Sequence, residues 1–500
     1  MKPWIVNRLF EIIEQRPEHI AVSQGGRQTT YGAFGLMVSA LAACFGEKSQ
    51  APRVAICAEP CAETYAAMFA AMLAGGFYVP LNAEAGQARL QTAFEEITPD
   101  VAVFSERTLH LAGTSGYLGP IIMTSNVSGH PKRIETARTA HRLAYVMFTS
   151  GSTGAPKGVM ISQDALGHYA RWAQTAMNIS LNDRWSQHPN IGFDLSVLDI
   201  YGALLGGATL YPLNEPIDRL FPARAIKKYS LTIWNSVPSV MGMILKSGDW
   251  TQDNAASLRL MTFCGEPLLP EHVEGIFKVL PDVEVHNTYG PTEATVSCSL
   301  LKLTKENYRQ HAKASIALGD PIQGTQFFID GGTRGELLIA GLQLADGYWN
   351  DPAKTANAFK LVRRDGRDFI AYHTGDFVLR DATGLYFTER QDNQVKIKGH
   401  RVELNEISSH IRRLGYVHAE TIMEGQSIIA LIEGNEDAKA AQRVREYLSL
   451  KLEAYMQPQK IVFMATFPRN ANDKIDLAAL KAAWDKLNNH QVSTSPAIDL

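Results

Sequence analysis

Residues 145–159 read Tyr-Val-Met-Phe-Thr-Ser-Gly-Ser-Thr-Gly-Ala-Pro-Lys-Gly-Val. The apolar start, Tyr145 to Phe148, predicts a buried strand, and the apolar run from Val159 predicts a second strand. The loop between them carries hydroxyl residues, glycines and a single lysine, Lys157. Glycines let a backbone approach a ligand closely, small hydroxyls add donors, and a lysine supplies a point charge for phosphate oxygens. The stretch therefore predicts a loop that binds the phosphates of a nucleotide.

This loop differs from a Walker-type P-loop, which ends in Gly-Lys-Ser/Thr and opens a helix. Here the order is Pro156, Lys157 and Gly158, and a strand-like run follows. A flexible surface linker is the alternative, because stretches rich in serine and glycine are usually only that. That alternative leaves the flanking strands and the single lysine unexplained.

Composition and charge narrow the class of protein. The chain has 500 residues, which is too long for one core, and a formal net charge of −3. That charge favours neither nucleic acid nor an anionic membrane as the main partner. The five cysteines form no CxxC pair and no zinc-like cluster, as is typical of reduced thiols in the cytoplasm. No run is long enough to insert into a membrane, and the start does not resemble a signal peptide. We expect a cytoplasmic monomer.

The pattern of strands and helices predicts the fold class. Between residues 53 and 300, short apolar strands alternate with helix-length segments, which predicts α/β layers with helices on the sheet faces. Residues 315–390 read as a β-rich subdomain, and residues 393–500 as a mixed α+β region. The last residues, Gln491 to Leu500, are expected to be a disordered end.

Residues 148–159, Phe-Thr-Ser-Gly-Ser-Thr-Gly-x-Pro-Lys-Gly-Val, resemble the signature of adenylate-forming enzymes. That superfamily includes acyl-CoA synthetases, firefly-type luciferases and the adenylation domains of peptide synthetases. The resemblance extends from about Pro17 to Leu480. It implies an N-terminal adenylation core over residues 1–391 and a small mobile domain over residues 392–500. It also implies ATP and Mg²⁺ as cofactors.

Two further motifs fit nucleotide binding. Residues 287–296, Asn-Thr-Tyr-Gly-Pro-Thr-Glu-Ala-Thr-Val, follow a strand-like lead, which places them at the sheet edge where α/β proteins bind ligands. Tyr289 can stack on a base, Thr292 can donate to a phosphate and Glu293 can hold Mg²⁺, and the resemblance implies the same roles. Asp376 can accept hydrogen bonds from both ribose hydroxyls. The alternative for Asp376 is the cap of a turn, and the alternative for residues 287–296 is a plain turn with a solvated glutamate. The expected ATP- and AMP-binding residues are Thr149, Ser150, Gly151, Ser152, Thr153, Gly154, Lys157, Asn287, Thr288, Tyr289, Gly290, Thr292, Asp376 and Arg390.

The resemblance assigns roles to three residues near the C-terminus. Asp392 matches the hinge of the small domain, and Gly399 matches a glycine that lines a pantetheine tunnel. Lys474 matches a lysine that contacts the substrate carboxylate and the α-phosphate, where a cation stabilises developing negative charge. Taken alone it would be an ordinary surface lysine. The chain carries Glu389 and Asp473 where relatives have glycine. The expected catalytic residues are Lys157, Thr292, Glu293 and Lys474.

Asp194 indicates the class of substrate. It follows the apolar residues Ile191 and Phe193, so it is expected at a helix start that faces a pocket. A buried carboxylate needs a partner, and the α-ammonium of an amino acid is one. In amino-acid-activating relatives the matching aspartate has that role, whereas a helix cap is the alternative. The expected amino-acid-binding residues are Phe193, Asp194, Leu195, Leu198, Asn235, Thr262, Cys264, Gly265, Thr288, Val296, Ser297 and Lys474.

These pocket residues are small to medium in size and mildly polar, which predicts a small amino acid. The motifs resemble most those of D-alanine:D-alanyl carrier protein ligases, in which a cysteine matching Cys264 favours the D enantiomer. Alternatively, Cys264 is a small buried hydrophobe. Asn235 and Ser297 are more polar than alanine requires, so serine, glycine, proline or an unusual amino acid stays open.

The expected reaction has two steps. ATP activates the amino acid as an aminoacyl-AMP with release of pyrophosphate, and the phosphopantetheine thiol of a separate carrier protein then takes the aminoacyl group. We expect the carrier protein to be a separate chain, because residues 481–500 show no pattern of a Ser-centred carrier module. A CoA ligase for a small acid and a nucleotide-binding scaffold without catalysis are the alternatives.

Overall fold

The computed structural model describes residues 4–127, 142–150, 156–390, 394–397, 399–425, 427–435, 438–469 and 475–493. The chain divides into two compact units. The first comprises residues 1–149, 156–392 and 398–401, and the second comprises residues 150–155, 393–397 and 402–500. The hinge expected at Asp392 lies outside the described residues, and it stays a prediction.

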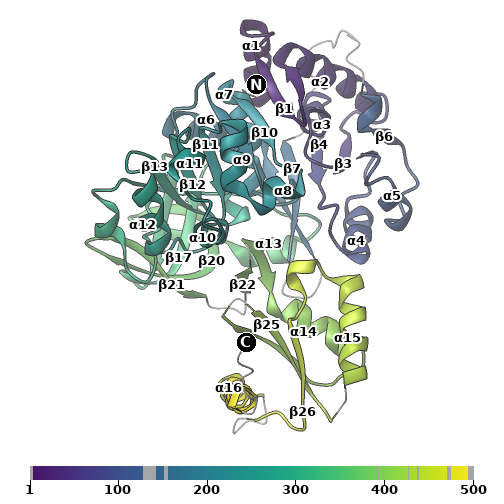
Figure 1. Ribbon diagram of the computed structural model, residues 1–500. Coiled ribbons are helices and arrows are strands. Elements are labelled where there is room, and N and C mark those ends of the chain that lie inside the picture. Colours follow the sequence, from purple (N-terminus) through teal and green to yellow (C-terminus); the bar gives the residue numbers. More distant parts are fainter. Residues whose placement is uncertain are drawn as a thin grey trace. The chain divides into compact units, whose positions relative to one another are not determined.

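A seven-stranded sheet in the first unit contains β7 and β8, the strands that precede and follow residues 151–155 in the sequence; β3, β4, β6 and β7 of this sheet are labelled in Figure 1. Its strand order is β18-β8-β7-β4-β3-β5-β6. Strands β3 to β7 pair in parallel, whereas β7 pairs antiparallel with β8, as expected for a hairpin-like loop. The strands are β3 (Arg53–Cys57), β4 (Phe77–Pro80), β5 (Val101–Phe104), β6 (Ile121–Met123), β7 (Leu143–Thr149), β8 (Lys157–Ser162) and β18 (Gly347–Tyr348). The helices between the parallel strands are α3 (Ala62–Leu73), α4 (Gln87–Ile97) and α5 (His110–Thr114).

A second sheet of nine strands positions the remaining α/β motifs. Its order is β15-β14-β13-β12-β11-β9-β10-β1-β2, with parallel pairing from β13 to β1 and antiparallel strands at both edges. The strands are β1 (Ile20–Gln24), β2 (Arg27–Thr30), β9 (Arg184–Gln187), β10 (Thr209–Pro212), β11 (Ile233–Ser236), β12 (Leu260–Phe263), β13 (Glu284–Tyr289), β14 (Ser299–Leu303) and β15 (Asp320–Pro321). The helices of this half are α1 (Trp4–Gln15), α2 (Tyr31–Gly46), α6 (Gln163–Ala176), α7 (Leu195–Gly206), α8 (Pro216–Leu220), α9 (Pro222–Tyr229), α10 (Pro238–Lys246), α11 (Gln252–Ala255) and α12 (Pro270–Val279).

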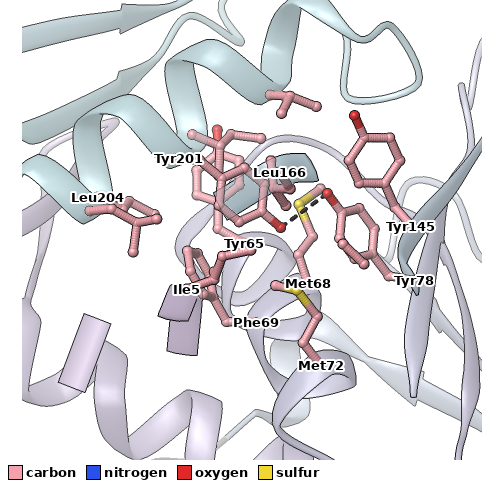
Figure 2. Packing of buried hydrophobic residues seen from close by; sticks show 14 of the residues in the cluster. Ile5, Tyr65, Met68, Phe69, Met72, Tyr78, Tyr145, Leu166, Tyr201 and Leu204 are labelled. Carbon is pink, nitrogen blue, oxygen red and sulfur yellow. Dashed lines mark hydrogen bonds between the residues drawn. The ribbon is translucent and has the colours of Figure 1, made fainter. Parts of the chain in front are cut away.

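The largest apolar core joins elements of both sheets. It contains the buried faces of helices α1, α2, α3, α6 and α7. Phe69 of α3 packs against Tyr201 of α7 with ring centroids 5.0 Å apart, and Tyr201 donates a hydrogen bond to Tyr78 of β4 at 3.0 Å (Figure 2). Helix α7 is buried from Leu195 to Leu205, and this packing sets the position of Asp194 immediately before it.

A third, antiparallel sheet forms the β-rich subdomain expected near residues 315–390. Its strands run in the order β16-β17-β20-β19, and β21 also pairs with β20. The elements are β16 (Thr325–Asp330), β17 (Arg334–Gly341), α13 (Pro352–Ala358), β19 (Phe359–Arg364), β20 (Arg367–Asp381) and β21 (Gly384–Arg390). The register places Asp376 of β20 opposite Arg390 of β21, which brings two predicted nucleotide contacts together.

The second unit has the mixed α+β pattern expected for residues 393–500. Helix α14 and strands β24 and β25 share a small core with helix α15. The elements are β22 (Gln394–Ile397), α14 (Leu404–Arg413), β24 (Ala419–Glu424), β25 (Ser427–Glu433), α15 (Ala438–Lys451), β26 (Lys460–Met464) and α16 (Leu477–Ser493). Strand β23 (His400–Glu403) begins in the first unit and ends in the second. The disordered end predicted from Gln491 is wrong at its start, because α16 continues to Ser493. None of the helices that the structure describes has the length and apolarity to cross a bilayer.

Candidate active site

The predicted phosphate loop lies in the sequence between the antiparallel strands β7 and β8. Thr149 at the end of β7 pairs with Lys157 at the start of β8. The Lys157 Nζ donates to Glu293 Oε1 at 2.9 Å, so the predicted loop lysine lies against the predicted metal-binding glutamate. The expected loop contacts Gly151, Ser152, Thr153 and Gly154 lie outside the described residues.

Glu293 is the electrostatic centre of the site. Its side chain is fully buried, and Oε1 also accepts a hydrogen bond from Tyr348 Oη at 2.8 Å. Arg401 Nη1 donates to Oε2 at 2.8 Å, and both residues belong to the first unit. Burial by itself would raise the pKa of Glu293, but Arg401 and Lys157 outweigh burial and hold the pKa well below its usual range. The carboxylate therefore stays ionised.

The side chains around Glu293 can be compared with the oxygen ligands that Mg²⁺ requires. The described residues contain no group of three or more His, Cys, Asp or Glu side chains that would hold an ion by themselves. A single carboxylate such as Glu293 suits Mg²⁺ when substrate phosphates supply other ligands. The residues therefore fit an ion that arrives with ATP and not a resident one. Lys157 and Arg401 already occupy the two oxygens of Glu293, so the ion would compete with these cations.

The predicted base and ribose contacts lie together. Tyr289 Oη donates to Asp376 Oδ2 at 2.5 Å, and Arg390 Nη1 donates to Asp376 Oδ1 at 2.6 Å. Burial raises the pKa of Tyr289, and the Asp376 carboxylate raises it further, so the phenol remains a donor. Because a carboxylate has about four acceptor positions, Asp376 keeps capacity for ribose hydroxyls while Tyr289 and Arg390 hold its orientation.

Three neighbours of Tyr289 also have structural contacts. Asn287 donates its amide to the Ala317 carbonyl at 2.7 Å, and Thr288 donates to the Phe263 carbonyl at 3.0 Å. Gly290 has no room for a side chain, because an added Cβ would lie 2.5 Å from Ser297 Cα. These contacts shape the turn, and direct nucleotide contacts from these three residues stay a prediction.

Asp194 lies where the sequence predicted, immediately before helix α7. Its side chain is 8% exposed and makes no capping hydrogen bond to the helix. Instead, Asp194 Oδ2 accepts a hydrogen bond from Thr292 Oγ1 at 2.6 Å. The helix-cap alternative therefore does not describe this carboxylate. Thr292 connects it to the segment that carries Tyr289.

The predicted pocket residues gather around the N-terminal half of α7. Leu195, Leu198, Cys264 and Val296 belong to one apolar cluster, and Phe193 packs against it. Cys264 Sγ lies 3.9 Å from the Val296 carbonyl oxygen. The remaining positions are polar or lack a side chain: Ser297 shares a 3.1 Å hydrogen bond with Tyr169, Gly265 has a φ of +92°, and Asn235 and Thr262 are fully buried.

Gly399 has two reasons to be glycine. Its φ is +81°, and an added Cβ would lie 2.1 Å from Val237 Cγ1. Its N–H donates to Glu266 Oε1 at 2.6 Å, which fixes the backbone here. Glu389 lies in β21 with an exposed side chain, so the ladder accommodates it. Lys474 and Asp473 lie outside the described residues.

A family model described as AMP-binding enzyme matches residues 9–349, which is more than half of the chain. The chain belongs to this family. The D-alanine–D-alanyl carrier protein ligase of Listeria monocytogenes serotype 4a (strain HCC23) is 32% identical over 362 residues, covering 68% of this chain and 70% of the relative. The ligase of the same name from Lacticaseibacillus rhamnosus is 29% identical over 506 residues, covering 96% of this chain and 98% of the relative.

Solved structures of the family agree with the fold. The Vibrio cholerae adenylation domain AlmE in complex with glycyl-adenosine-5'-phosphate has a TM-score of 0.83 at 25% identity, and 98% of each chain is covered. Holo-PA1221, a peptide-synthetase protein with adenylation and carrier domains, has a TM-score of 0.82 at 22% identity and covers 96% of this chain and 84% of its own. The expected α/β class, with its β-rich subdomain and small C-terminal region, is confirmed, as is the resemblance to adenylate-forming enzymes. As a member of this family, the chain is a ligase.

Sequence reasoning missed several residues of the site. Tyr348 and Arg401 both contact Glu293, and Asp199 contacts Asn235. Arg401 stands two residues after the predicted Gly399, which was a usable signal. Tyr348 ends the short buried strand β18, and nothing in the sequence pattern marks it.

Proposed function

We propose that this enzyme activates a small amino acid with ATP and transfers it to the phosphopantetheine thiol of a separate carrier protein. Two kinds of comparison support the proposal. The relatives are named for D-alanine and a carrier protein, and the AlmE domain was solved with glycyl-adenosine-5'-phosphate. Both substrates are small, which agrees with the apolar surroundings of Leu195, Cys264 and Val296.

One arrangement carries the proposal. The segment from Tyr289 to Thr292 hydrogen-bonds Asp376 at one end and Asp194 at the other. Asp376 is the proposed ribose contact, and Asp194 is the proposed partner of the substrate's α-ammonium. An amino acid whose ammonium contacts Asp194 would place its carboxylate near Thr292. A nucleotide whose ribose contacts Asp376 would place its α-phosphate near the same residue. The two reactants are positioned by one short turn.

The chemistry then follows from charge. A carboxylate oxygen of the amino acid attacks the α-phosphorus, the bond to pyrophosphate breaks, and an aminoacyl-AMP remains. Mg²⁺ supplies charge neutralisation on the phosphates when it is bound. Lys157 is a cation at the phosphate loop, Thr292 is a hydroxyl donor, and Lys474 is the cation that we assign to the reacting oxygens. Asp194 holds the ammonium and discriminates against acids that lack one, because such acids bring no positive charge to this buried carboxylate.

The remaining proposals concern the setting. A monomer meets every requirement above, since each residue of the site belongs to one chain. The carrier protein is a separate chain, and Gly399 lies on the proposed path of its pantetheine arm. We place the enzyme in the cytoplasm, where ATP and carrier protein are available.

Exchange of labelled pyrophosphate into ATP tests the first step. We expect exchange that depends on an added small amino acid, with alanine, serine, glycine and proline compared as D and L forms where both exist. Mass spectrometry of a phosphopantetheinylated carrier then tests transfer. Exchange supported equally by simple carboxylic acids would contradict the proposal and favour a CoA ligase. Absence of exchange with every acid would favour a scaffold.

A further inference from the structure

Two buried polar atoms lie on neighbouring strands without a hydrogen-bond partner among the described residues. Asn235 of β11 and Thr262 of β12 are register partners, and both side chains are fully buried. The unpartnered atoms are Asn235 Oδ1 and Thr262 Oγ1. Register partners on parallel strands project to the same face of a sheet. Because buried polar atoms are nearly always paired, two such atoms side by side need an explanation.

The orientation of the Asn235 amide is determined by its surroundings. Its Nδ2 donates to Asp199 Oδ1 at 2.7 Å and faces the Leu195 carbonyl oxygen at 3.4 Å. Asp199 Oδ1 also accepts a hydrogen bond from Trp185 Nε1 at 3.0 Å. Both groups that face the amide nitrogen are acceptors, so the amide cannot be turned over without losing both contacts. Asn235 therefore presents a carbonyl acceptor away from Asp199.

The two atoms belong to the pocket side of the sheet. The residues that flank them on the same face, Val237 after Asn235 and Cys264 after Thr262, lie in the apolar cluster that also holds Leu195. Intervening residues such as Phe263 belong to a different cluster on the opposite face. The pair is thus an acceptor and a hydroxyl set among apolar side chains, beside the proposed amino-acid pocket. A hydroxyl satisfies both, because it donates one hydrogen bond and accepts another.

We propose that Asn235 and Thr262 form a subsite for a hydroxyl group on the substrate side chain. The substrate is then a small hydroxy amino acid such as serine, whose hydroxyl donates to Asn235 Oδ1 and accepts from Thr262 Oγ1. Asp199 is a positioning residue, since it acts on the substrate through the amide of Asn235. This inference rests on the proposed amino-acid activation.

Pyrophosphate exchange with serine and with 2-aminobutyrate tests the subsite. The two differ by a hydroxyl in place of a methyl group, so the comparison holds size nearly constant. We expect kcat/KM to favour serine over 2-aminobutyrate and alanine by about 10- to 100-fold in the preferred enantiomer. Equal or better exchange with 2-aminobutyrate or alanine overturns the subsite and leaves amino-acid activation standing. No exchange with any amino acid would overturn the proposed function instead.

Shape-conserving variants locate the effect. Thr262→Val removes the hydroxyl, and we expect the serine to 2-aminobutyrate ratio to fall toward one. The variant replaces an unpaired polar atom by an apolar one, so the thermal midpoint should not fall. Asp199→Asn keeps an acceptor for the Asn235 amide and should keep the ratio, whereas Asp199→Leu removes the acceptor and should lose it. An unchanged ratio in Thr262→Val overturns the subsite, and equal ratios in both Asp199 variants overturn the positioning role.

Discussion

Replacing Glu293 with glutamine is expected to destabilise the protein strongly, because two cations share this buried carboxylate. The Glu293 side chain is fully buried, and those of Lys157 and Arg401 are 10% and 15% exposed. Glutamine has nearly the same shape and keeps an oxygen for the Tyr348 hydroxyl, so packing changes little. What changes is charge, because Lys157 and Arg401 then lack their counter-ion.

The size of the effect follows from burial. Removing one partner of a buried ion pair typically costs about 3–5 kcal/mol, since an uncompensated charge remains inside. Lys157 and Arg401 keep some contact with water, so we expect a loss of about 3 kcal/mol for Glu293→Gln. Tyr348→Phe removes a hydrogen bond to Glu293 and no charge, and it should cost about 1–2 kcal/mol. The double variant Glu293→Gln/Arg401→Met should recover part of the loss, because one unpaired cation is gone.

Urea-induced unfolding followed by tryptophan fluorescence measures these differences. Glu95→Gln is the matched control, because its carboxylate is exposed and accepts a hydrogen bond from the neighbouring Gln91. It should leave the midpoint unchanged. If Glu293→Gln unfolds within about 1 kcal/mol of wild type, the two cations are not held by this carboxylate and the reasoning is refuted.

The other predictions vary pH, backbone shape, hydrogen bonding and metal. Because folding lowers the pKa of Glu293, the ionised carboxylate stabilises the folded state above the unfolded pKa of about 4.3, and this stabilisation is lost as the pH falls below that value. The difference in unfolding free energy between wild type and Glu293→Gln should therefore shrink below about pH 4 in urea titrations. A difference that stays constant with pH would contradict this. Gly399→Ala places a side chain against Val237 at positive φ, which should lower the unfolding free energy by about 1–2 kcal/mol. The variant should slow carrier loading more than pyrophosphate exchange. Equal losses in the two rates would argue against a pantetheine path at Gly399. Tyr289→Phe removes the hydrogen bond to Asp376 and should raise KM for ATP about 5- to 10-fold without changing KM for the amino acid. EDTA should abolish exchange yet leave the unfolding midpoint unchanged, because the described residues hold no metal cluster, and a lowered midpoint would indicate a resident ion.

Much of the fold is predictable because buried parallel strands are continuous apolar runs. The apolar run Val101–Phe104 is such a strand, β5, and all of its residues are buried. The motifs were informative for a related reason. Connections that leave the carboxyl ends of parallel strands lie at one edge of a sheet, which is why Asp194, in the connection after β9, and Thr292, in the connection after β13, meet.

Long-range partners were not predictable from the pattern. Arg401 is 108 residues from Glu293, and Asp199 is 36 residues from Asn235, yet each pair makes a short hydrogen bond. Residue identities show that such groups need partners, but the choice of partner depends on how the sheets and helices pack. The hydrogen bond between Asn235 and Asp199 also determines which atom of the Asn235 amide can contact a substrate. The amide nitrogen donates to Asp199, so the amide oxygen is the atom that faces the proposed pocket.

The disordered end predicted from Gln491 is wrong for its first three residues. Chain ends are commonly disordered, but α16 extends through Ser493, and residues 494–500 lie outside the described residues. Leu480 and Trp484 bury one face of this helix in a small core. A helix held by such contacts propagates cheaply past its last buried residue, because each further residue adds one hydrogen bond to an existing nucleus.

The most direct test of amino-acid activation compares each amino acid with its des-amino counterpart in pyrophosphate exchange. Alanine is compared with propionate, and serine with 3-hydroxypropionate, in wild type and in Asp194→Ala. We expect exchange with the amino acid and little with the des-amino acid in wild type, and loss of this discrimination in Asp194→Ala. Equal exchange with both acids in wild type would contradict the role of Asp194 and with it the central claim.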